Sequence, residues 1–566
     1  MQSHSNAIAL KKRRGADVLV DTLRLHGAEA AFCVPGESYL AVLDSLYDKR
    51  DEFKLIVCRH EGGVAFMAEA HAKATGKPGI AFVTRGPGAT NASIGVHTAF
   101  QDSTPMILFI GQVARAVSER EAFQEIDYRR MFGPMAKWVG QIDDASRIPE
   151  YVSRAYHTAM SGRRGPVVLA LPEDMLLDVV AVDDGIPYQV PQPHPSDEDM
   201  QRIAALLTKA RRPLMILGGS GWSAQACRDI SRFAVAHDLP VACSFRRQDL
   251  FDNCSPNYAG DVCEEPRLDD RIRQSDLLLL VGARMGEIPS GSYTLLDIPR
   301  PKQAIVQVHP GAEELGKIYQ ADVLVHAGMP AFAARAARLE PVGAPAWREW
   351  TANTHCDYLE SLKLPACPGA VDMGRVAALL RRVLSPETVI THGAGNFSAW
   401  ARRHYQYRQF GTMICPTSGS MGYALPGAIA AKIADPGRPV ICVTGDGDFL
   451  MNSQELSTAV RYGLPIVVIL INNNMYGTIR LYQERAFPAR VHGTDLSNPD
   501  FAAYARSFGA HGVVVERTEQ FEPAFVAALA ADRLTVIEVR VDQEALTPEQ
   551  TLSQIRAAAQ QQNMHA

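Results

Sequence analysis

Two short polar turns near the C-terminal end of the chain each follow an apolar run, and they restrict the fold more than any other feature of the sequence. Gly445-Asp446-Gly447 follows the run 440–443, and Asn472-Asn473-Asn474 follows the run 464–471, with a helical pattern over 450–460 between them. Unbroken apolar runs of this length are typical of parallel strands buried on both faces. We therefore expect both turns at the carboxyl ends of neighbouring strands, where open α/β sheets bind their ligands.

The residues of these turns suit a divalent cation that is bound together with a diphosphate. Mg²⁺ takes oxygen ligands, and it commonly uses one or two protein carboxylates while phosphate oxygens and waters complete its shell. Asp446 would supply the carboxylate and Asn473 an amide oxygen. A lone Gly-Asp-Gly is most often an ordinary turn, but its pairing with the Asn-rich turn across a helix and a buried strand favours the metal site.

This spacing resembles the motif of thiamine diphosphate-dependent enzymes, which opens with Gly-Asp-Gly and closes with Asn-Asn. Two N-terminal segments agree with it independently: His60-Glu61-Gly62-Gly63-Val64-Ala65 and Thr84-Arg85-Gly86-Pro87-Gly88-Ala89-Thr90-Asn91. Both look like the cofactor-activating region of the acetolactate synthase and pyruvate oxidase group. The similarity spans roughly the whole chain and is densest over 15–180 and 370–500. It implies thiamine diphosphate and Mg²⁺ as cofactors.

The chain is long enough for several domains. Its 566 residues exceed what one hydrophobic core normally supports, and helical and short apolar segments alternate along it, which predicts parallel sheets. The Pro-rich, acidic stretch 183–199 predicts a linker that ends near Ser196, a suitable N-cap. The expected fold class is α/β, with three doubly wound parallel-sheet domains. These are a pyrimidine-binding domain over 1–182, a nucleotide-fold-like central domain over 196–345, and a diphosphate- and Mg-binding domain over 368–550.

Composition excludes several functional classes. Hydrophobic residues make up 47% of the chain and charged residues 21%, and the net charge is only −5, which argues against binding nucleic acid. No apolar run is long enough to span a membrane, and no signal peptide is visible. The ten cysteines show no CxxC spacing, which favours buried, reduced thiols. We expect a cytoplasmic enzyme, with the basic run 11–14 forming a solvated, frayed leader.

Glu61 is the candidate for cofactor activation. It follows the apolar run 55–58 and opens a helix, a half-buried position where the pKa of a carboxyl group tends to rise. An acid favoured by the helix dipole is the alternative interpretation. The resemblance implies that Glu61 contacts the aminopyrimidine ring and promotes loss of the thiazolium C2 proton. It also places Pro35 and Asn91 on the pyrimidine side.

The resemblance further implies the residues at the other end of the cofactor. Met475 would join Asp446 and Asn473 on the metal through its carbonyl oxygen, and Met421 would wedge the cofactor into a bent shape, with simple core packing as the alternative. The family often has Gln-His where this chain has Asn396-Phe397. The remaining cofactor contacts are expected at Gly395, Asn396, Phe397, Gly419, Gly447, Asp448 and Gly477.

Phe123, Gln124 and Lys137 are the expected substrate residues, because their segments resemble the acetolactate synthase pattern. An amphipathic helix with exposed polar residues is the alternative. The chain has no His between 111 and 133, whereas decarboxylases of the pyruvate and indolepyruvate type have an adjacent His pair in roughly this region.

Four positions depart from the synthase pattern and point to a changed acceptor pocket: Gly62, Arg85, His97 and Tyr482. Tyr482 stands where those synthases have a Trp that selects the second oxo acid. Arg85 could bind a substrate carboxylate bidentately, or it could form a surface salt bridge.

FAD is an open alternative for the central domain. Gly218-Gly219-Ser220-Gly221 and Gly282-Ala283-Arg284 resemble parts of a dinucleotide site, although a single Gly-rich turn is a weak signal. Segments 260–264 and 307–310 lack the Gly-His-Gly type of turn and the acidic pair that such a site needs. The missing groups favour a central domain without flavin.

The sequence thus predicts a decarboxylating carboligase that acts on 2-oxo acids, converting pyruvate to acetolactate and CO₂. The alternatives are a 2-oxo acid decarboxylase, lyase or oxidase of the same superfamily, and a non-catalytic thiamine diphosphate-binding relative. Because the family builds each site across two chains, we expect a homo-oligomer, a dimer at minimum and commonly a tetramer.

Overall fold

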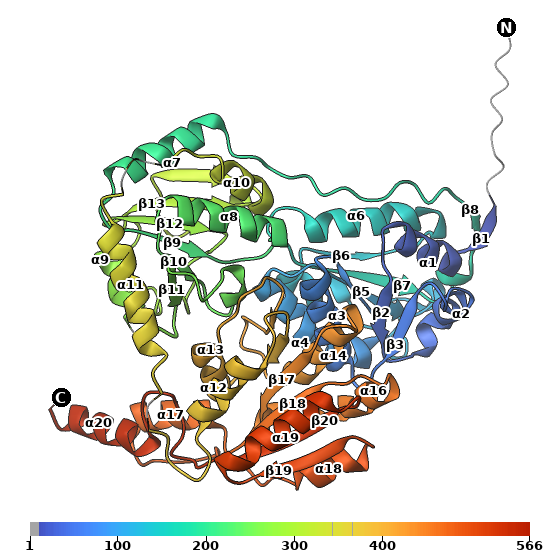
Figure 1. The fold of residues 1–566 in the computed structure, drawn as a ribbon. Coiled ribbons are helices and arrows are strands. Elements are labelled where there is room, and N and C mark those ends of the chain that lie inside the picture. Colours follow the sequence, from blue (N-terminus) through green and yellow to red (C-terminus); the bar gives the residue numbers. More distant parts are fainter. Residues whose placement is uncertain (1–10, 266, 342, 344, 365, 566) are drawn as a thin grey trace. The chain divides into compact units, whose positions relative to one another are not determined.

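Three parallel six-stranded sheets with flanking helices make up the protein (Figure 1). The computed structural model describes residues 11–565 apart from 266, 342, 344 and 365. These residues divide into two compact units, one formed by residues up to 72 and 77–191, the other by 73–76 and the chain from Gln192 onward. The predicted α/β class with three parallel-sheet domains is confirmed.

The first unit contains the sheet of order β3-β2-β4-β5-β7-β6. Its strands are β3 (Lys54–Val57), β2 (Ala30–Cys33), β4 (Gly79–Val83), β5 (Met106–Gln112), β7 (Pro166–Pro172) and β6 (Trp138–Gln141). Every residue of β4, β5 and β7 is buried, as their apolar runs predict. One core joins the sheet to α1 (Gly15–Leu25), α2 (Leu40–Asp48) and α6 (Ile148–Met160).

Helices α3 (Glu61–Thr75) and α4 (Gly86–Asp102) pack against each other through small residues. A Cβ atom on Gly95 of α4 would lie 2.2 Å from the Cβ of Ala65 in α3, so only glycine allows this approach. Gly79 at the start of β4 is equally restricted, because its Cβ would lie 1.8 Å from the Ala68 carbonyl oxygen. This packing fixes the first turn of α3, which begins at Glu61, relative to α4.

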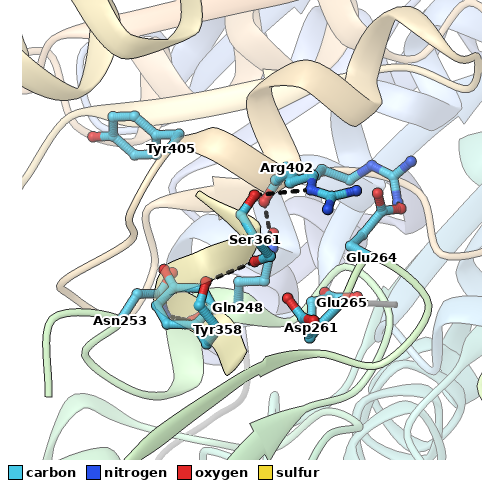
Figure 2. A pocket seen from close by; sticks show the side chains of 10 residues that line it. Gln248, Asn253, Asp261, Glu264, Glu265, Tyr358, Ser361, Arg402 and Tyr405 are labelled. Carbon is cyan, nitrogen blue, oxygen red and sulfur yellow. Dashed lines mark hydrogen bonds and ion pairs between the residues drawn. The ribbon is translucent and has the colours of Figure 1, made fainter. Parts of the chain in front are cut away.

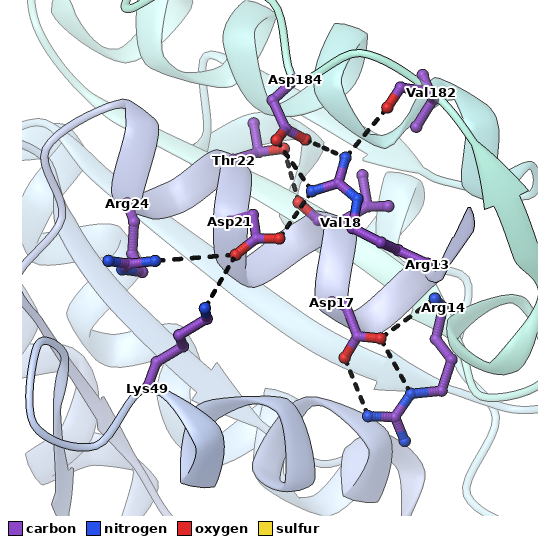
Figure 3. Close-up of polar contacts among 10 residues, drawn as sticks. All are labelled: Arg13, Arg14, Asp17, Val18, Asp21, Thr22, Arg24, Lys49, Val182 and Asp184. Carbon is purple, nitrogen blue, oxygen red and sulfur yellow. Dashed lines mark hydrogen bonds and ion pairs between the residues drawn. The ribbon is translucent and has the colours of Figure 1, made fainter. Parts of the chain in front are cut away.

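The basic run near the N-terminus is not a frayed leader, so that prediction was wrong. Strand β1 (Lys12–Arg14) pairs antiparallel with β8 (Val179–Ala181). Arg13 forms ion pairs of 2.7 Å with both Asp21 and Asp184, and its side chain is only 14% exposed (Figure 3). Asp184 lies 171 residues away in sequence, so local composition could not reveal that the positive charge is neutralised.

The predicted linker leads into the second unit. Residues 182–196 form neither helix nor strand, and α7 (Asp197–Lys209) follows. The predicted N-cap is confirmed, because Ser196 Oγ accepts a hydrogen bond of 3.0 Å from the Asp199 N–H.

The middle sheet has the order β11-β10-β9-β12-β13-β14, so the strand order reverses between β9 and β12. Its strands are β11 (Tyr258–Asp261), β10 (Val241–Cys243), β9 (Pro213–Leu217), β12 (Leu277–Val281), β13 (Ala304–His309) and β14 (Val323–His326). Besides α7, its helices are α8 (Ala224–Ala236), α9 (Leu268–Gln274), α10 (Met329–Ala336) and α11 (Arg348–Ser361). Doubly wound sheets bind dinucleotides at such a reversal point.

The third sheet has the order β16-β15-β17-β18-β20-β19. Its strands are β16 (Met413–Ile414), β15 (Val389–His392), β17 (Val440–Gly445), β18 (Val467–Asn472), β20 (Thr535–Arg540) and β19 (His511–Val515). Its main helices are α12 (Met373–Val383), α13 (Phe397–His404), α14 (Ala424–Ala434), α17 (Gly477–Ala486), α18 (Phe501–Ser507) and α19 (Thr518–Ala530).

The two polar turns lie where the sequence predicts. Strands β17 and β18 pair in parallel, with Gly445 opposite Ile471, so both turns leave the same edge of the sheet. Short helices α15 (Asp446–Phe449) and α16 (Leu456–Arg461) connect the two strands. The chain ends in α20 (Leu552–His565), and over the described residues no helix is both long and apolar enough to cross a membrane.

Buried polar contacts join the middle and third sheets within the second unit. Gln248 Nε2 donates to the Arg402 carbonyl oxygen over 2.6 Å, and the Tyr407 N–H donates to Asn253 Oδ1 over 2.9 Å. Arg402 also forms an ion pair with Glu264. These contacts explain why the two sheets belong to one compact unit although the sequence predicts separate domains.

Candidate active site

The side chain of Asp446 is buried and held at both carboxylate oxygens. It begins α15 directly after β17, and Oδ1 accepts a hydrogen bond of 3.0 Å from the Gly447 N–H. Asn498 Nδ2 donates to Oδ2 over 2.8 Å. Burial raises the pKa of Asp446, and the hydrogen bond from Asn498 opposes that rise. The carboxylate is thus fixed at a helix start on the ligand-binding edge of the sheet.

The Asn-rich turn touches this helix start. A Cβ atom on Gly447 would lie 2.6 Å from the ring of Tyr476, so the two turns approach closely only because Gly447 has no side chain. Asn473 Oδ1 accepts a hydrogen bond of 3.2 Å from the Met475 N–H. Asn474 has a positive φ of 56°, a conformation that asparagine tolerates well.

The donor set on these turns fits Mg²⁺ and a diphosphate. It consists of the Asp446 carboxylate, the Asn473 amide oxygen and the Met475 carbonyl oxygen, which are all hard oxygen ligands. Within the described part of the chain, no three His, Cys, Asp or Glu side chains cluster as a metal site. A cation here would therefore depend on amide, carbonyl and phosphate oxygens as well as on one carboxylate.

Asp448 uses its side chain to tie two loops to the end of strand β17. Its carboxylate accepts hydrogen bonds from the Gly422 N–H at 2.9 Å, the Ala394 N–H at 3.3 Å and Thr444 Oγ1 at 2.7 Å. Burial raises its pKa to about 6. Because these three groups occupy both oxygens, a contact of this residue with a diphosphate would come from its backbone N–H.

Phe397 and Asn396 both follow β15, but they make different contacts. A Cβ atom on Gly395 or on Gly445 would lie 2.5 Å from the Phe397 ring, so the ring packs against the glycine that opens the first turn. Asn396 Oδ1 accepts a hydrogen bond of 3.0 Å from Thr478 Oγ1, at the start of α17 beside Gly477. Its Nδ2 is buried and has no partner in the described structure, which leaves one donor for a ligand.

The segment predicted to grip the pyrimidine is anchored on Asp448 through Gly422. Gly419 has φ of 74° and no atom within 4 Å of its missing Cβ, so the left-handed turn rather than crowding requires glycine there. Met421 is half-buried beside it. Both residues thus lie on a loop fixed to the metal-side turns.

In the first unit, Glu61 is held at the start of α3. Asn91 Nδ2 of α4 donates to Glu61 Oε2 over 2.9 Å. A Cβ atom on Gly88 would lie 3.4 Å from Glu61 Oε1, so the first turn of α4 passes beside the carboxylate. The His60 ring accepts a hydrogen bond of 3.0 Å from the Gly62 N–H through Nδ1, which stabilises the helix start. The structure thus brings Glu61 and Asn91 together.

A tight loop places the predicted substrate residues Phe123 and Gln124 beside the start of α4. The Gly86 N–H donates to the Gln124 carbonyl oxygen over 2.9 Å, and Gln124 has a positive φ of 65°. The side chain of Glu125 organises the loop by accepting hydrogen bonds from Ser118 Oγ and the Glu119 N–H, at 3.0 and 2.9 Å. The segment is a turn, so the alternative of an amphipathic helix was wrong.

Phe123 lies at the exposed tip of the same loop, with 72% of its surface accessible. This exposure leaves the Phe123 ring accessible to a ligand. Pro35 is also exposed, after β2, where Gly36 packs so closely that its Cβ would lie 2.5 Å from the Thr84 side chain. Pro35 therefore lies at the carboxyl end of a strand, as Glu61 does.

Lys137 lies elsewhere in the first unit. It precedes β6, and its N–H donates to the Pro166 carbonyl oxygen at the amino end of β7. Its ammonium group donates to the Ser161 carbonyl oxygen over 2.6 Å. Since Glu61 follows the carboxyl end of β3 in the same parallel sheet, the structure does not bring the two residues together within this unit.

Two departures from the synthase pattern have different surroundings. Arg85 is buried and donates from Nη2 to Glu173 over 2.6 Å and from Nη1 to Glu37 over 3.4 Å, so protein carboxylates occupy its guanidinium group. Tyr482 on α17 is 59% exposed. Arg85 therefore has a structural role in its own unit, whereas Tyr482 is accessible to a ligand.

The two loops at the reversal point of the middle sheet lie close together. A Cβ atom on Gly219, after β9, would lie 2.3 Å from the Gly282 carbonyl oxygen, after β12, so the two loops that would flank the ligand touch. The Trp222 indole donates to the Gly218 carbonyl oxygen over 2.8 Å. His309, at the end of β13 in the segment that lacks the expected acidic pair, is buried, and its Nδ1 contacts the Gly311 backbone.

The described pocket of the second unit lies between the middle and third sheets (Figure 2). Its roughly 250 Å³ of space between atoms includes open solvent, so it is a hollow at the surface and not an enclosed cavity. Burial raises the pKa of its three carboxyl groups, at Asp261, Glu264 and Glu265. The other lining residues are Gln248, Asn253, Tyr358, Ser361, Arg402, Arg403 and Tyr405. This lining is more polar than that of most pockets that bind small molecules.

Sequence reasoning missed Asn498. It lies between α17 and α18 and contacts Asp446, which is 52 residues away in sequence. No local pattern marks it, because its role depends entirely on where the chain returns to the sheet edge.

Comparison with known proteins covers all three sheets. The N-terminal TPP binding domain of thiamine pyrophosphate enzymes matches residues 13–131, the central domain 200–335 and the C-terminal TPP binding domain 393–539. The acetolactate synthase large subunit of Parasynechococcus marenigrum is 34% identical, over 93% of this chain and 87% of its own length. The acetolactate synthase isozyme 2 large subunit of Escherichia coli is 31% identical, over 94% and 96% of the two chains. The protein therefore belongs to the thiamine diphosphate-dependent enzymes and, within them, to the acetolactate synthase family.

Proposed function

We propose that the protein is a thiamine diphosphate- and Mg²⁺-dependent carboligase that joins two molecules of pyruvate into acetolactate and releases CO₂. The names of its relatives support the reaction. The observation that carries the proposal is the Glu61–Asn91 pair at the start of α3, next to the loop that presents Phe123. Thiamine diphosphate, when bound, supplies the electron sink for decarboxylation and for carbon–carbon bond formation.

Glu61 is the residue we assign to proton transfer at the aminopyrimidine. Asn91 fixes one carboxylate oxygen and leaves the other, Oε1, beside Gly88. A carboxylate that is oriented in this way can hold a proton at a defined position, which is the requirement for general acid–base catalysis. We assign Phe123 and Gln124 to the substrate side, because the Gly86–Gln124 hydrogen bond anchors their loop to α4.

Asp446, Asn473 and the Met475 carbonyl oxygen are the groups we assign to Mg²⁺. They lie on two turns that touch at Gly447 and Tyr476, and each offers a hard oxygen ligand. The Asn396 Nδ2 group and the N–H groups that open α15 would hold the diphosphate, because helix starts favour anions. We assign no step to FAD.

We further propose that the protein works as a homodimer or a higher homo-oligomer. The pyrimidine-side residues and the metal-side residues belong to different units of the chain. A second copy of the chain could therefore complete each site. Light scattering after size-exclusion chromatography, with and without the cofactors, measures the assembly directly, and a monomer under both conditions would contradict the proposal.

The test of the function is incubation of the purified protein with thiamine diphosphate, Mg²⁺ and pyruvate, followed by quantification of pyruvate and acetolactate. Formation of one acetolactate for every two pyruvate molecules supports the proposal. Free acetaldehyde would instead identify a decarboxylase, and consumption of an electron acceptor would identify an oxidase. We propose that the central domain holds no flavin, so a visible spectrum recorded beforehand should lack flavin absorption.

A further inference from the structure

Asn498 connects the two turns of the metal side through a single amide nitrogen. Its Nδ2 lies 2.8 Å from Asp446 Oδ2, 3.0 Å from Asn472 Oδ1 and 3.1 Å from Asn474 Oδ1. It comes from the segment between α17 and α18, so it belongs to neither turn. One side chain from a third segment therefore contacts both turns that carry the assigned metal ligands.

The orientation of this amide follows from its neighbours. Asn472 Nδ2 donates to Glu538 Oε1 over 2.9 Å, so the Asn472 amide must direct its oxygen toward Asn498. Arg540 Nε donates to the same Glu538 oxygen, which indicates that this carboxylate accepts rather than donates. Asp446 also offers an acceptor to Asn498. The group of Asn498 that faces them is consequently its NH₂ group.

Without a donor between them, the convergent oxygens of the two turns would repel one another. Asp446, Asn472 and Glu538 are all at least nine-tenths buried, so solvent cannot easily replace a missing donor. A buried acceptor without a partner is destabilised, most of all a charged one. The NH₂ group has two hydrogens for three acceptors, and the bond to the Asp446 carboxylate should be the strongest because it is charge-assisted.

We propose that Asn498 is a positioning residue for the metal side: it holds the Asp446 carboxylate and the Asn-rich turn in the arrangement that receives Mg²⁺. The proposal rests on the proposed function, because it takes Asp446 and Asn473 as metal ligands. Asn498 Oδ1 is itself buried and without a partner among the described residues. It is therefore an acceptor that a water of the metal's shell can use, since Mg²⁺ keeps several waters.

Two substitutions separate the hydrogen-bond role from packing. Asn498→Leu keeps roughly the volume of the side chain but has no N–H donor, and Asn498→Ala removes both. If Asn498 acts through its NH₂ group, both variants should weaken Mg²⁺ binding about 10- to 100-fold, as loss of outer-shell partners commonly does. If it acts by filling space, the Leu variant should bind Mg²⁺ like the wild type. Ser497→Ala, at the exposed neighbouring residue, is the matched control.

The experiment is calorimetric titration of Mg²⁺ into the full-length protein with thiamine diphosphate present, which needs no turnover. We expect a larger dissociation constant in both Asn498 variants and wild-type affinity for thiamine diphosphate once Mg²⁺ saturates. Unchanged Mg²⁺ affinity in either variant overturns the positioning role while the proposed function stands. Collapse of the fold in both variants, seen by circular dichroism, also overturns it, because Asn498 would then be required for folding. A wild type without Mg²⁺-dependent cofactor binding overturns the proposed function, and the positioning role with it.

Discussion

Asn91 Nδ2 lies 2.9 Å from Glu61 Oε2 and donates a hydrogen bond to it. The two residues come from different helices, α4 and α3, whose close packing at Gly95 and Ala65 fixes their distance. The pair therefore depends on the backbone geometry of the first unit rather than on two flexible side chains finding each other. That rigidity is what a catalytic carboxylate needs.

Glu61→Gln should reduce turnover by about 10²- to 10⁴-fold, the usual contribution of a general acid–base group. The amide oxygen of Gln can still accept the hydrogen bond from Asn91, so we expect the fold and metal binding to be retained. Exchange of the thiazolium C2 proton of bound cofactor for deuterium, followed by NMR, measures the step directly. Exchange at the wild-type rate would remove Glu61 from the proposed role.

The control for this substitution is Glu52→Gln, on the surface of the same unit. The Glu52 side chain is 61% exposed, and its only described partner is Arg24, so its neutralisation should change little. A comparable loss of activity in both variants would indicate a general effect of lost negative charge instead of a specific one.

Asp446→Ala should make cofactor binding insensitive to Mg²⁺. The side chain supplies the only carboxylate among the three assigned metal ligands, and its removal leaves one amide and one carbonyl oxygen. We expect the dissociation constant for thiamine diphosphate to rise at least about 10-fold at fixed Mg²⁺. Quenching of tryptophan fluorescence during titration measures it, with Asp532→Ala at an exposed position as control. An unchanged constant would count against the metal assignment.

Much of the fold could be predicted because local patterns determine it. The apolar runs before Asp446 and Asn473 are buried strands β17 and β18, and their parallel pairing brings the two turns to one edge. Ser196 caps α7, as a serine before acidic residues predicts. In each case the information lies within a few residues of the feature.

The features that could not be predicted depend on contacts between distant segments. The charge of Arg13 is neutralised by Asp184, and the metal-side turns are joined by Asn498. The family pattern that marks Lys137 as a substrate residue stays a prediction, and it did not indicate that the strand order places Lys137 at the opposite edge of the sheet from Glu61 within this unit. Neither the separation of two residues in the sequence nor the likeness of a motif to a family shows which distant segments come into contact.

The stability of the first unit should fall as the pH drops below about 6.5. Burial, together with the charge of His157, lowers the pKa of His26 from 6.5 to about 4. The ring packs against Tyr156 and Tyr188, and Nδ1 accepts a hydrogen bond of 3.0 Å from the Tyr188 N–H. Between pH 6.5 and about pH 4, His26 is protonated in the unfolded chain and neutral in the folded chain. This contribution, on the order of 1–3 kcal/mol, is therefore present above pH 6.5 and lost progressively toward pH 4.

His26→Gln tests this pH dependence, because Gln can still accept the Tyr188 hydrogen bond but does not titrate. Urea midpoints measured from pH 4 to pH 7.5 should show a shallower decline toward acid for the variant than for the wild type. His194→Gln, at an exposed histidine, should reproduce the wild-type slope. Parallel curves for wild type and His26→Gln would contradict the assignment.

Tyr482→Trp should shift acceptor choice toward a larger 2-oxo acid. The resemblance to acetolactate synthases implies that a Trp at this position would select the second oxo acid, and Tyr482 on α17 is 59% exposed and accessible to a ligand. One methylene in an apolar pocket changes selectivity by roughly 10- to 200-fold, so we expect a shift at the lower end of that range. Competition between pyruvate and 2-oxobutanoate, with quantification of both products, measures it. Tyr47→Trp, at another exposed tyrosine, should leave the ratio unchanged. A ratio equally unchanged in Tyr482→Trp would place the acceptor pocket away from α17.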